Sequence, residues 1–195
     1  SRDGLGIPAE PLFPWQARPF GVAGYSRATP KLIPGARMHG FAPPRESIEK
    51  ARAASLRAIE ADAQFYIGHS ALGWTRLWTG DLEGACKSFR EALRLNPSAP
   101  YALHGDADCL MLEGRMDESV NRAREVLLIG PFSAMHNRPL PFHLFIARRY
   151  DEAVSAAIAA QARAPGYSMQ SLLARVYWAQ GDLDKALDAE RRELD

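Results

Sequence analysis

The stretch that decides the fold is YIGHSALGWTRLWTGDLEGACKSFREALRLNPSA, residues 66–99. Its periodicity predicts two helices, over 64–79 and 82–95, joined by a tight turn at Gly80. Small and apolar residues recur where the two helices would face each other, at Leu72, Gly73, Leu77, Ala85, Phe89, Ala92 and Leu95. A hairpin of this kind cannot bury its apolar face alone, so the stretch predicts stacking on similar neighbours.

The same pattern returns with a period of 34 residues. Gly80 and Gly114 are 34 residues apart, and Pro97, Pro131 and Pro165 follow one another at intervals of 34. Such a period is typical of an array in which each helix hairpin packs only against the next. The sequence therefore predicts an all-α repeat domain over 45–195. Its parts are a half repeat at 45–63 and repeats at 66–99, 100–133, 134–166 and 167–195.

Residues 1–44 differ in kind from the rest of the chain. They hold eight of the 14 prolines together with six glycines, and this composition cannot build a core of its own. We interpret them as a Pro/Gly-rich irregular N-terminal extension. Three alternatives stay open: a tail draped over the repeats, a disordered segment, or a segment that docks Phe13, Trp15 and Phe20 into a groove of this chain or of a second copy.

Composition excludes several classes of partner. The formal net charge is +1, which favours neither nucleic acid nor an acidic membrane surface. No apolar run approaches the roughly 20 residues that a membrane-spanning helix needs. The two cysteines, Cys86 and Cys109, lack metal-ligand spacing, so we expect them to act as small apolar thiols in a reducing cytoplasm.

The third repeat departs from the pattern in its first helix. Pro139 and Pro141 fall where that helix should already be running, and an interior proline costs about 3 kcal/mol. Because proline is well tolerated at the first helical position, we predict a helix that begins at Pro141 and ends at Arg148. Residues 133–140 would then form a loop.

The array resembles tetratricopeptide repeats. Positions that match the family pattern in repeat one are Leu72, Gly73, Ala85, Phe89, Ala92 and Pro97, and those in repeat three are Tyr150, Ala153, Ala160 and Pro165. The resemblance implies a right-handed α-α superhelix, a solenoid of antiparallel helix hairpins, whose first helices line a concave groove that holds peptides or partner proteins. The style of the repeats is also similar to repeat regions attached to bacterial adenylate cyclases and transcriptional regulators.

The resemblance also implies which residues line the groove. They are Ser70, Trp74, Trp78, Tyr101, His104, Asp108, Arg138, Phe142, Phe145, Arg175 and Trp178. Trp74 and Trp78 are one helical turn apart, and we expect that both cannot be buried on the same face, so that at least one lines the groove. The family's carboxylate clamp is absent, because Ser70, Trp74 and Asp108 stand at its positions. An apolar or Pro-rich peptide is therefore the expected ligand.

Two polar pairs stand out among the apolar positions. Arg76 and Asp106 would face adjacent hairpins, and because a lone buried charge is costly we predict a salt bridge between them. His104 and Asp108 are four residues apart on one helix face and could share a metal ion. Two ligands do not make a site, so we predict no metal, no other cofactor and no catalytic residues.

The function predicted from sequence is a non-enzymatic scaffold that binds proteins or peptides. It would act alone or as the interaction part of a larger bacterial protein. The alternative is a self-assembling module, in which the N-terminal segment docks into the groove of its own or a second chain and so forms a homodimer.

Overall fold

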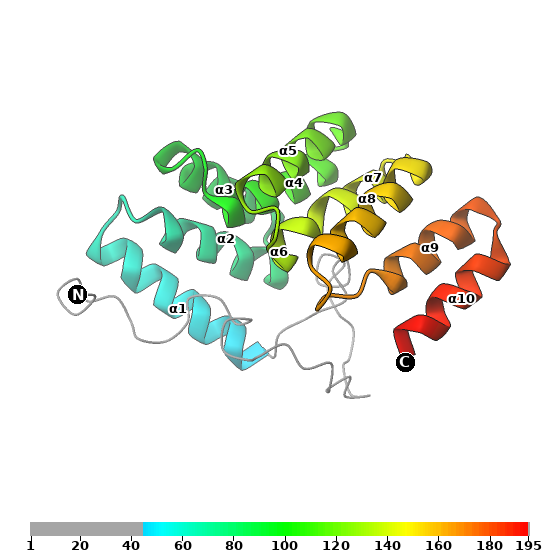
Figure 1. The fold of residues 1–195 in the computed structure, drawn as a ribbon. Helices are drawn as coiled ribbons and strands as arrows, with labels where there is room; N and C mark the ends of the chain where they lie inside the picture. Colours follow the sequence, from blue (N-terminus) through cyan, green and yellow to red (C-terminus); the bar gives the residue numbers. More distant parts are fainter. Residues whose placement is uncertain (1–44, 195) are drawn as a thin grey trace. The chain divides into compact units, whose positions relative to one another are not determined.

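The computed structural model describes residues 45–194. Within this range the chain forms α-helices joined by short turns and contains no β-strand, which confirms the predicted all-α repeat (Figure 1). Contacts along the chain divide it into two units, and the division falls inside helix α4 (Pro100–Leu112). The predicted docking of Phe13, Trp15 and Phe20 lies outside the described residues.

The first unit contains three complete helices and the beginning of α4. They are α1 (Arg45–Ala61), α2 (Tyr66–Thr79) and α3 (Leu82–Leu95). Helix α1 packs on α2, and α2 packs on α3 as an antiparallel hairpin (Figure 1). In α1 the buried residues Ile48, Ala51, Ala54 and Ala58 recur every three or four positions, so one stripe of this helix faces α2.

The packing of a single aromatic ring explains why two positions of this unit are occupied by glycine. Phe89 of α3 is fully buried, and its ring lies against Gly73 of α2 and Gly105 of α4. A Cβ atom added at Gly73 would lie 2.5 Å from the ring, and one added at Gly105 would lie 2.4 Å from it. Because real Cβ atoms do not approach this closely, both positions require glycine for Phe89 to pack here.

The second unit contains the end of α4 and the remaining helices. These are α5 (Met116–Ile129), α6 (Ala134–Asn137), α7 (Pro139–Ile146), α8 (Tyr150–Arg163), α9 (Gln170–Gln180) and α10 (Leu183–Leu194). Contacts run from α5 to α7 and then from each helix to the next, α7 to α8, α8 to α9 and α9 to α10. Small residues such as Ala153, Ala157 and Ala160 let these helices approach closely around Leu144, Leu173 and Val176.

Turns between paired helices use one backbone conformation. Gly80, Gly114 and Gly181 have φ angles of 87°, 78° and 83°, in the left-handed region that glycine enters without steric cost. The third hairpin has Arg148 at the equivalent place, with φ of 59°. The turn of each of these hairpins therefore needs the left-handed backbone conformation at this position, even where the residue is an arginine.

The third repeat begins differently from the prediction. Its first helix, α7, starts at Pro139 rather than at Pro141, and it ends at Ile146 rather than at Arg148. Residues 134–137 form the short helix α6 instead of a loop. Pro139 at the first position and Pro141 two residues later both fall in the first turn, where no intrahelical hydrogen bond needs their missing N–H groups.

Both cysteines are disulfide-bonded, and neither is a free thiol. The expectation that Cys86 and Cys109 act as reduced apolar residues is therefore wrong, although both are buried.

None of the helices over residues 45–194 combines the length and the apolar character that a bilayer-spanning helix requires.

Candidate functional site

In the first unit, most of the predicted groove residues are buried. Trp74 is 4% exposed and Trp78 is 6% exposed. Ser70 and His104 are buried as well, and Tyr101 is half-buried. The expectation that both tryptophans cannot be buried is wrong, because α2 is covered by more than one neighbouring helix and its buried face is wider than a single stripe.

Trp74 is the centre of an aromatic cluster. Its ring centroid lies 5.8 Å from that of Trp78, 5.4 Å from Phe89 and 5.0 Å from His104, and the last two contacts are edge-to-face. Its indole Nε1 donates a hydrogen bond of 3.2 Å to the carbonyl of Tyr101. Because both the ring and the indole N–H of Trp74 make contacts inside the unit, we interpret Trp74 as a core residue that stabilises the fold.

The predicted Arg76–Asp106 salt bridge would join the two units and stays a prediction. Within the first unit Arg76 lies 3.5 Å from the Asp81 carboxylate and donates hydrogen bonds to the Gly84 carbonyl and the Ser88 hydroxyl. These partners belong to the turn and helix that follow Arg76 directly. Sequence spacing missed them because a long arginine side chain satisfies its charge with the nearest available acceptors.

Asp106 is paired as well. Its carboxylate lies 2.9 Å from Nε of Arg122 on α5, and Arg122 also contacts Glu125 at 2.7 Å. Asp106 is 4% exposed, and a carboxylate this buried needs such a cationic partner.

In the second unit, the predicted groove residues differ in how far they are exposed to solvent. Asp108 and Phe142 are buried, and Arg138 and Phe145 are half-buried. Arg175 and Trp178, one helical turn apart on α9, are both exposed. Trp178 is 71% exposed, which is unusual for the largest apolar side chain.

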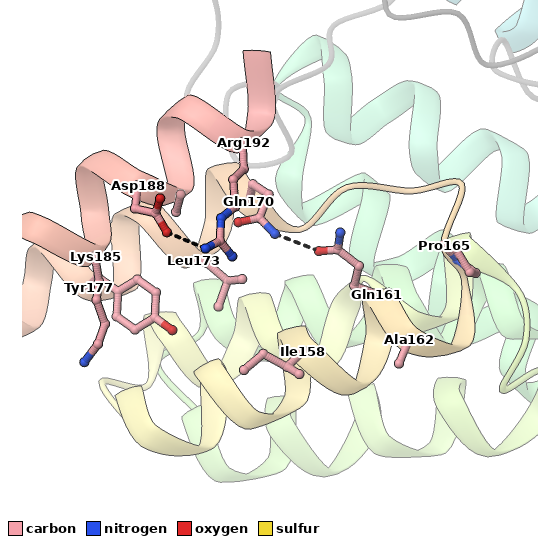
Figure 2. Close-up of a pocket in the computed structure, with 11 residues that line it drawn as sticks. Ile158, Gln161, Ala162, Pro165, Gln170, Leu173, Tyr177, Lys185, Asp188 and Arg192 are labelled. Atoms are coloured by element: carbon pink, nitrogen blue, oxygen red, sulfur yellow. Dashed lines mark hydrogen bonds and ion pairs between the residues drawn. The ribbon is translucent and has the colours of Figure 1, made fainter. Parts of the chain in front are cut away.

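Beside α9 the surface is hollowed. The hollow has a volume of about 710 Å³ and lies among α8, α9 and α10 (Figure 2). Leu173 and Tyr177 of α9 and Ile158 of α8 supply its apolar surface. Gln161 and Gln170 point toward each other at one end and share a hydrogen bond of 3.1 Å.

Charged side chains of α10 border this hollow. Arg192 contacts Asp188 at 2.7 Å (Figure 2). Lys185 lies 5.6 Å from the centroid of the Tyr177 ring and contacts Asp182 at 2.7 Å. The hydrogen bond between them raises the pKa of Lys185 and lowers the pKa of Asp182, so both groups stay ionised at neutral pH. An apolar floor with a charged border is typical of a surface that contacts another protein.

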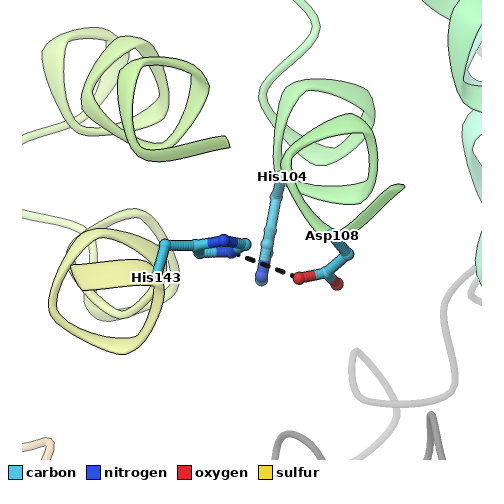
Figure 3. A group of neighbouring side chains, drawn as sticks. All are labelled: His104, Asp108 and His143. Carbon is cyan, nitrogen blue, oxygen red and sulfur yellow. Dashed lines mark ion pairs between the residues drawn. The ribbon is translucent and has the colours of Figure 1, made fainter. Parts of the chain in front are cut away.

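A serine, a histidine and an aspartate meet in the interior of the second unit. Ser119 Oγ lies 2.6 Å from His143 Nδ1, and His143 Nε2 lies 3.2 Å from Asp108 Oδ1 (Figure 3). The order resembles a hydrolytic triad, but Ser119 is 1% exposed and donates its one hydrogen to the Ala107 carbonyl. A nucleophile must reach its substrate, so this arrangement does not describe a hydrolase.

The same histidine extends the pair that the sequence singled out. His104 and Asp108 lie one turn apart on α4, and His143 of α7 points toward Asp108 (Figure 3). Sequence reasoning missed His143 as a partner of Asp108, because the two side chains meet only when α7 packs against the end of α4.

Comparison with known proteins supports the fold. No curated protein matches the sequence. Among solved structures, the chain is similar to TTC0263, a thermophilic protein of Thermus thermophilus, with a TM-score of 0.66 and 18% identity over 76% of this chain and 82% of that one. It is also similar to MamA from Desulfovibrio magneticus RS-1, with a TM-score of 0.62 and 16% identity over 76% and 84% of the two chains.

A third similar structure is YrrB, described as a tetratricopeptide repeat protein with an unusual peptide-binding site. Its TM-score is 0.55, with 17% identity over 74% of this chain and 75% of that one.

The model of the tetratricopeptide repeat family matches residues 70–133 and 144–195, which is more than half of the chain. The matched ranges cover the helix hairpins that carry the 34-residue period. The chain therefore belongs to the tetratricopeptide repeat family.

Proposed function

We propose that this chain is a non-enzymatic scaffold that binds a peptide or a partner protein, with the exposed face of α9 as its anchoring surface. The observation that carries the proposal is Trp178, which exposes 71% of its surface and has Arg175 one turn before it on the same helix. Tryptophan and arginine are among the residues enriched at binding hot spots. The exposed ring of Trp178 lies on the same helix as the apolar side chains of the hollow, and apolar surface gathered in this way supports a role in binding.

The surroundings of α9 support a ligand that is mainly apolar. The hollow beside α9 offers Leu173, Tyr177 and Ile158 to an apolar side chain of the ligand. Lys185 and Arg192 at its border would contact polar or acidic groups. An apolar or Pro-rich peptide suits this surface, since an extended proline-containing segment loses little entropy when it binds aromatic side chains.

Family membership adds general support. YrrB, which shares the fold, is described as having a peptide-binding site. We include in this proposal the case in which the chain is the interaction part of a larger bacterial regulator. In that case the repeats would bind the partner, and another part of the protein would carry out its activity.

The test is a peptide selection followed by affinity measurement. A displayed random peptide library is selected on the full chain, and the enriched peptides are titrated against the wild type and three variants. We expect Trp178→Ala to weaken binding by about 30-fold or more, as for a hot-spot residue. Phe132→Ala is the matched control, because Phe132 is 79% exposed but lies outside α9, and it should leave affinity unchanged.

The third variant separates the contribution of Trp178 from that of the hollow. Ile158→Ala removes an apolar group of the hollow that is 55% exposed, and we expect at most a few-fold loss. If the enriched peptides bind Trp178→Ala as tightly as wild type and lose affinity only for Ile158→Ala, the anchoring surface is the hollow and the proposal about Trp178 is wrong. Circular dichroism of each variant checks that the helices are intact.

Self-assembly is the second candidate, supported by a different observation. Leu183 and Leu187 lie one turn apart on α10 and are 57% and 58% exposed. Two such leucines on one helix face would suit contact with a second copy. Light scattering across a concentration series tests it: Leu187→Lys should shift an oligomer toward monomer, and a wild type that is monomeric at every concentration would exclude it.

A further inference from the structure

We propose that the hollow beside α9 binds a proline-rich segment of the partner protein in the polyproline II conformation, and that Gln161 and Tyr177 select this segment by donating hydrogen bonds to its backbone carbonyls. This inference rests on the proposed function, because it concerns the ligand of the same surface. It is carried by the hydrogen-bond chemistry of the two side chains and by their spacing along the hollow.

The backbone of the protein fixes the orientation of the Gln161 amide. Its Oε1 accepts hydrogen bonds from the backbone N–H of Met169 over 3.4 Å and from Nε2 of Gln170 over 3.1 Å. A backbone N–H group can only donate, so the oxygen of Gln161 must face Met169 and its Nε2 group must face away. The two hydrogens of this Nε2 group have no acceptor among residues 45–194. Gln161 therefore offers a donor at one end of the hollow.

Tyr177 offers a second donor. Its half-buried ring packs against the core formed by α8, α9 and α10, and in Figure 2 its hydroxyl extends from α9 toward the side of the hollow where Ile158 lies. Within the part of the chain that the structure describes, this hydroxyl makes no hydrogen bond. A phenol can donate its hydrogen to a carbonyl oxygen, so Tyr177 can bind the backbone of a ligand.

The separation of the two donors suits one turn of a polyproline II helix. Gln161 contacts Gln170, the first residue of α9, and Tyr177 lies seven residues further along this helix. Seven residues of an α-helix rise by about 10.5 Å. A polyproline II helix has three residues per turn and rises by about 3.1 Å per residue, so equivalent carbonyls recur about every 9.3 Å. Carbonyls of ligand residues three apart can therefore reach both donors.

Apolar surface lies between the two donors. Leu173 of α9 is 5% exposed and forms the floor of the hollow, and Ile158 of α8 is 55% exposed and forms its wall. Proline suits such a surface, because its ring is apolar and its nitrogen carries no hydrogen. Burial of a proline here therefore leaves no backbone donor without a partner.

Two other ligand conformations match this surface less well. An α-helix uses its backbone carbonyls internally and would leave the side chains of Gln161 and Tyr177 without acceptors. In a β-strand the residues that face the same side recur every second position, about 6.8 Å apart, which is shorter than the separation of the two donors. A polyproline II helix has no internal hydrogen bonds, so all of its carbonyls are available.

Fluorescence anisotropy with two synthetic peptides tests the inference on the full chain. Both peptides have about 12 residues; one repeats Pro-Pro-Leu and the other repeats Ala-Ala-Leu. We expect the chain to bind the Pro-Pro-Leu peptide about 10-fold or more tightly, because only this peptide is preformed in the polyproline II conformation and lacks most backbone donors.

Two variants separate the donors from the rest of the surface. Tyr177→Phe keeps the ring but loses the hydroxyl, and it should weaken binding of the Pro-Pro-Leu peptide by about 3- to 10-fold. Gln161→Glu keeps an oxygen that faces Met169 but replaces the donor with a second acceptor, and it should weaken binding by about 10-fold or more. Neither change should alter the affinity for the Ala-Ala-Leu peptide. Tyr66→Phe and Gln64→Glu, the same changes in the first unit, should bind like wild type.

Two results would overturn the role of the donors. One is equal affinity of the wild type for the two peptides. The other is wild-type affinity for the Pro-Pro-Leu peptide in both Tyr177→Phe and Gln161→Glu. If Trp178→Ala still weakens binding of the selected peptides in that case, the proposed function stands and only the present inference fails. Should Gln161→Glu fail to fold, Tyr177→Phe decides, because it removes a single oxygen atom.

A further variant tests whether the ligand comes from a separate protein. It replaces three aromatic residues of the N-terminal extension with serine in the full chain, namely Phe13, Trp15 and Phe20. We expect this variant to bind the Pro-Pro-Leu peptide like wild type. Binding that appears only in this variant would show that the chain's own N-terminal segment occupies the hollow, and it would overturn the assignment to a partner protein.

Discussion

Arg148 adopts the left-handed backbone conformation that Gly114 adopts 34 residues earlier, with φ of 59° against 78°. Both residues sit in the turn between the two helices of their repeat. Glycine enters this region freely, whereas a residue with a Cβ atom is destabilised there by about 1–2 kcal/mol. The third repeat thus carries backbone strain that the flanking helices α7 and α8 impose.

Replacing Arg148 with glycine should therefore stabilise the protein. The relief of strain exceeds the extra entropy of an unfolded glycine, so we expect Arg148→Gly to raise the free energy of unfolding by about 0.5–1 kcal/mol. Urea unfolding measures it. Arg57→Gly, in the exposed interior of α1, is the matched control and should lower stability by about 1 kcal/mol. A loss of stability in Arg148→Gly would contradict this account of the turn.

The packing of Phe89 against Gly105 predicts that replacing this glycine with a slightly larger residue lowers the stability of the protein. Gly105→Ala places a Cβ atom 2.4 Å from the Phe89 ring, and we expect a loss of about 1–3 kcal/mol despite the better helix propensity of alanine. Adding Phe89→Leu to Gly105→Ala should cost less than the sum of the two single changes, because the ring is removed. Gly166→Ala, which meets nothing within 4 Å, is the control. Additive effects in the double variant would show that the ring is not the obstacle.

Reduction should destabilise the chain. Both cysteines are disulfide-bonded, and a native disulfide contributes about 2–4 kcal/mol, so reductant should lower the Tm of the wild type. The double variant Cys86→Ala/Cys109→Ala should unfold at one temperature with or without reductant. Two titratable thiols in unreduced, unfolded protein would rule out the disulfide.

His136 should make stability depend on pH. Burial lowers the pKa of its imidazole below the ordinary value of 6.5, although a hydrogen bond with the Gly130 backbone opposes the shift. The unfolded chain then binds a proton more readily than the folded chain, so stability falls as pH drops below about 6.5 through the folded-state pKa. NMR titration should give a His136 pKa below 6.5, and His136→Gln should lose less stability than wild type between about pH 7.5 and 5.5. A His136 pKa at or above 6.5 would refute the assignment.

Local features of the fold could be predicted from sequence, whereas features that depend on neighbouring repeats could not. The glycines at 80 and 114 and the spaced prolines determined the helix hairpins, because turn chemistry acts within a few residues. The burial of both Trp74 and Trp78 depends on how many helices cover α2, which periodicity in one helix does not report.

For the candidate sites as well, local features could be predicted from sequence and contacts between helices could not. Trp178 was placed in the groove from its position in the repeat pattern; the structure leaves it exposed, and its role in binding stays a prediction. The contacts of Arg76 with Asp81, Gly84 and Ser88 were not predicted, because they depend on how the long arginine side chain folds back over the turn that follows it. His143 was missed because its approach to Asp108 arises only when α7 packs in place.

The most direct test of the proposed function follows the four tryptophan indole N–H signals in a ¹H–¹⁵N NMR spectrum while a selected peptide is added. Substitution of each tryptophan with phenylalanine assigns the signals. We expect the Trp178 signal to move with saturating peptide, while that of Trp74, whose Nε1 is bound to the Tyr101 carbonyl, stays in place. A Trp178 signal that does not change while peptide binds would contradict the claim that α9 anchors the partner.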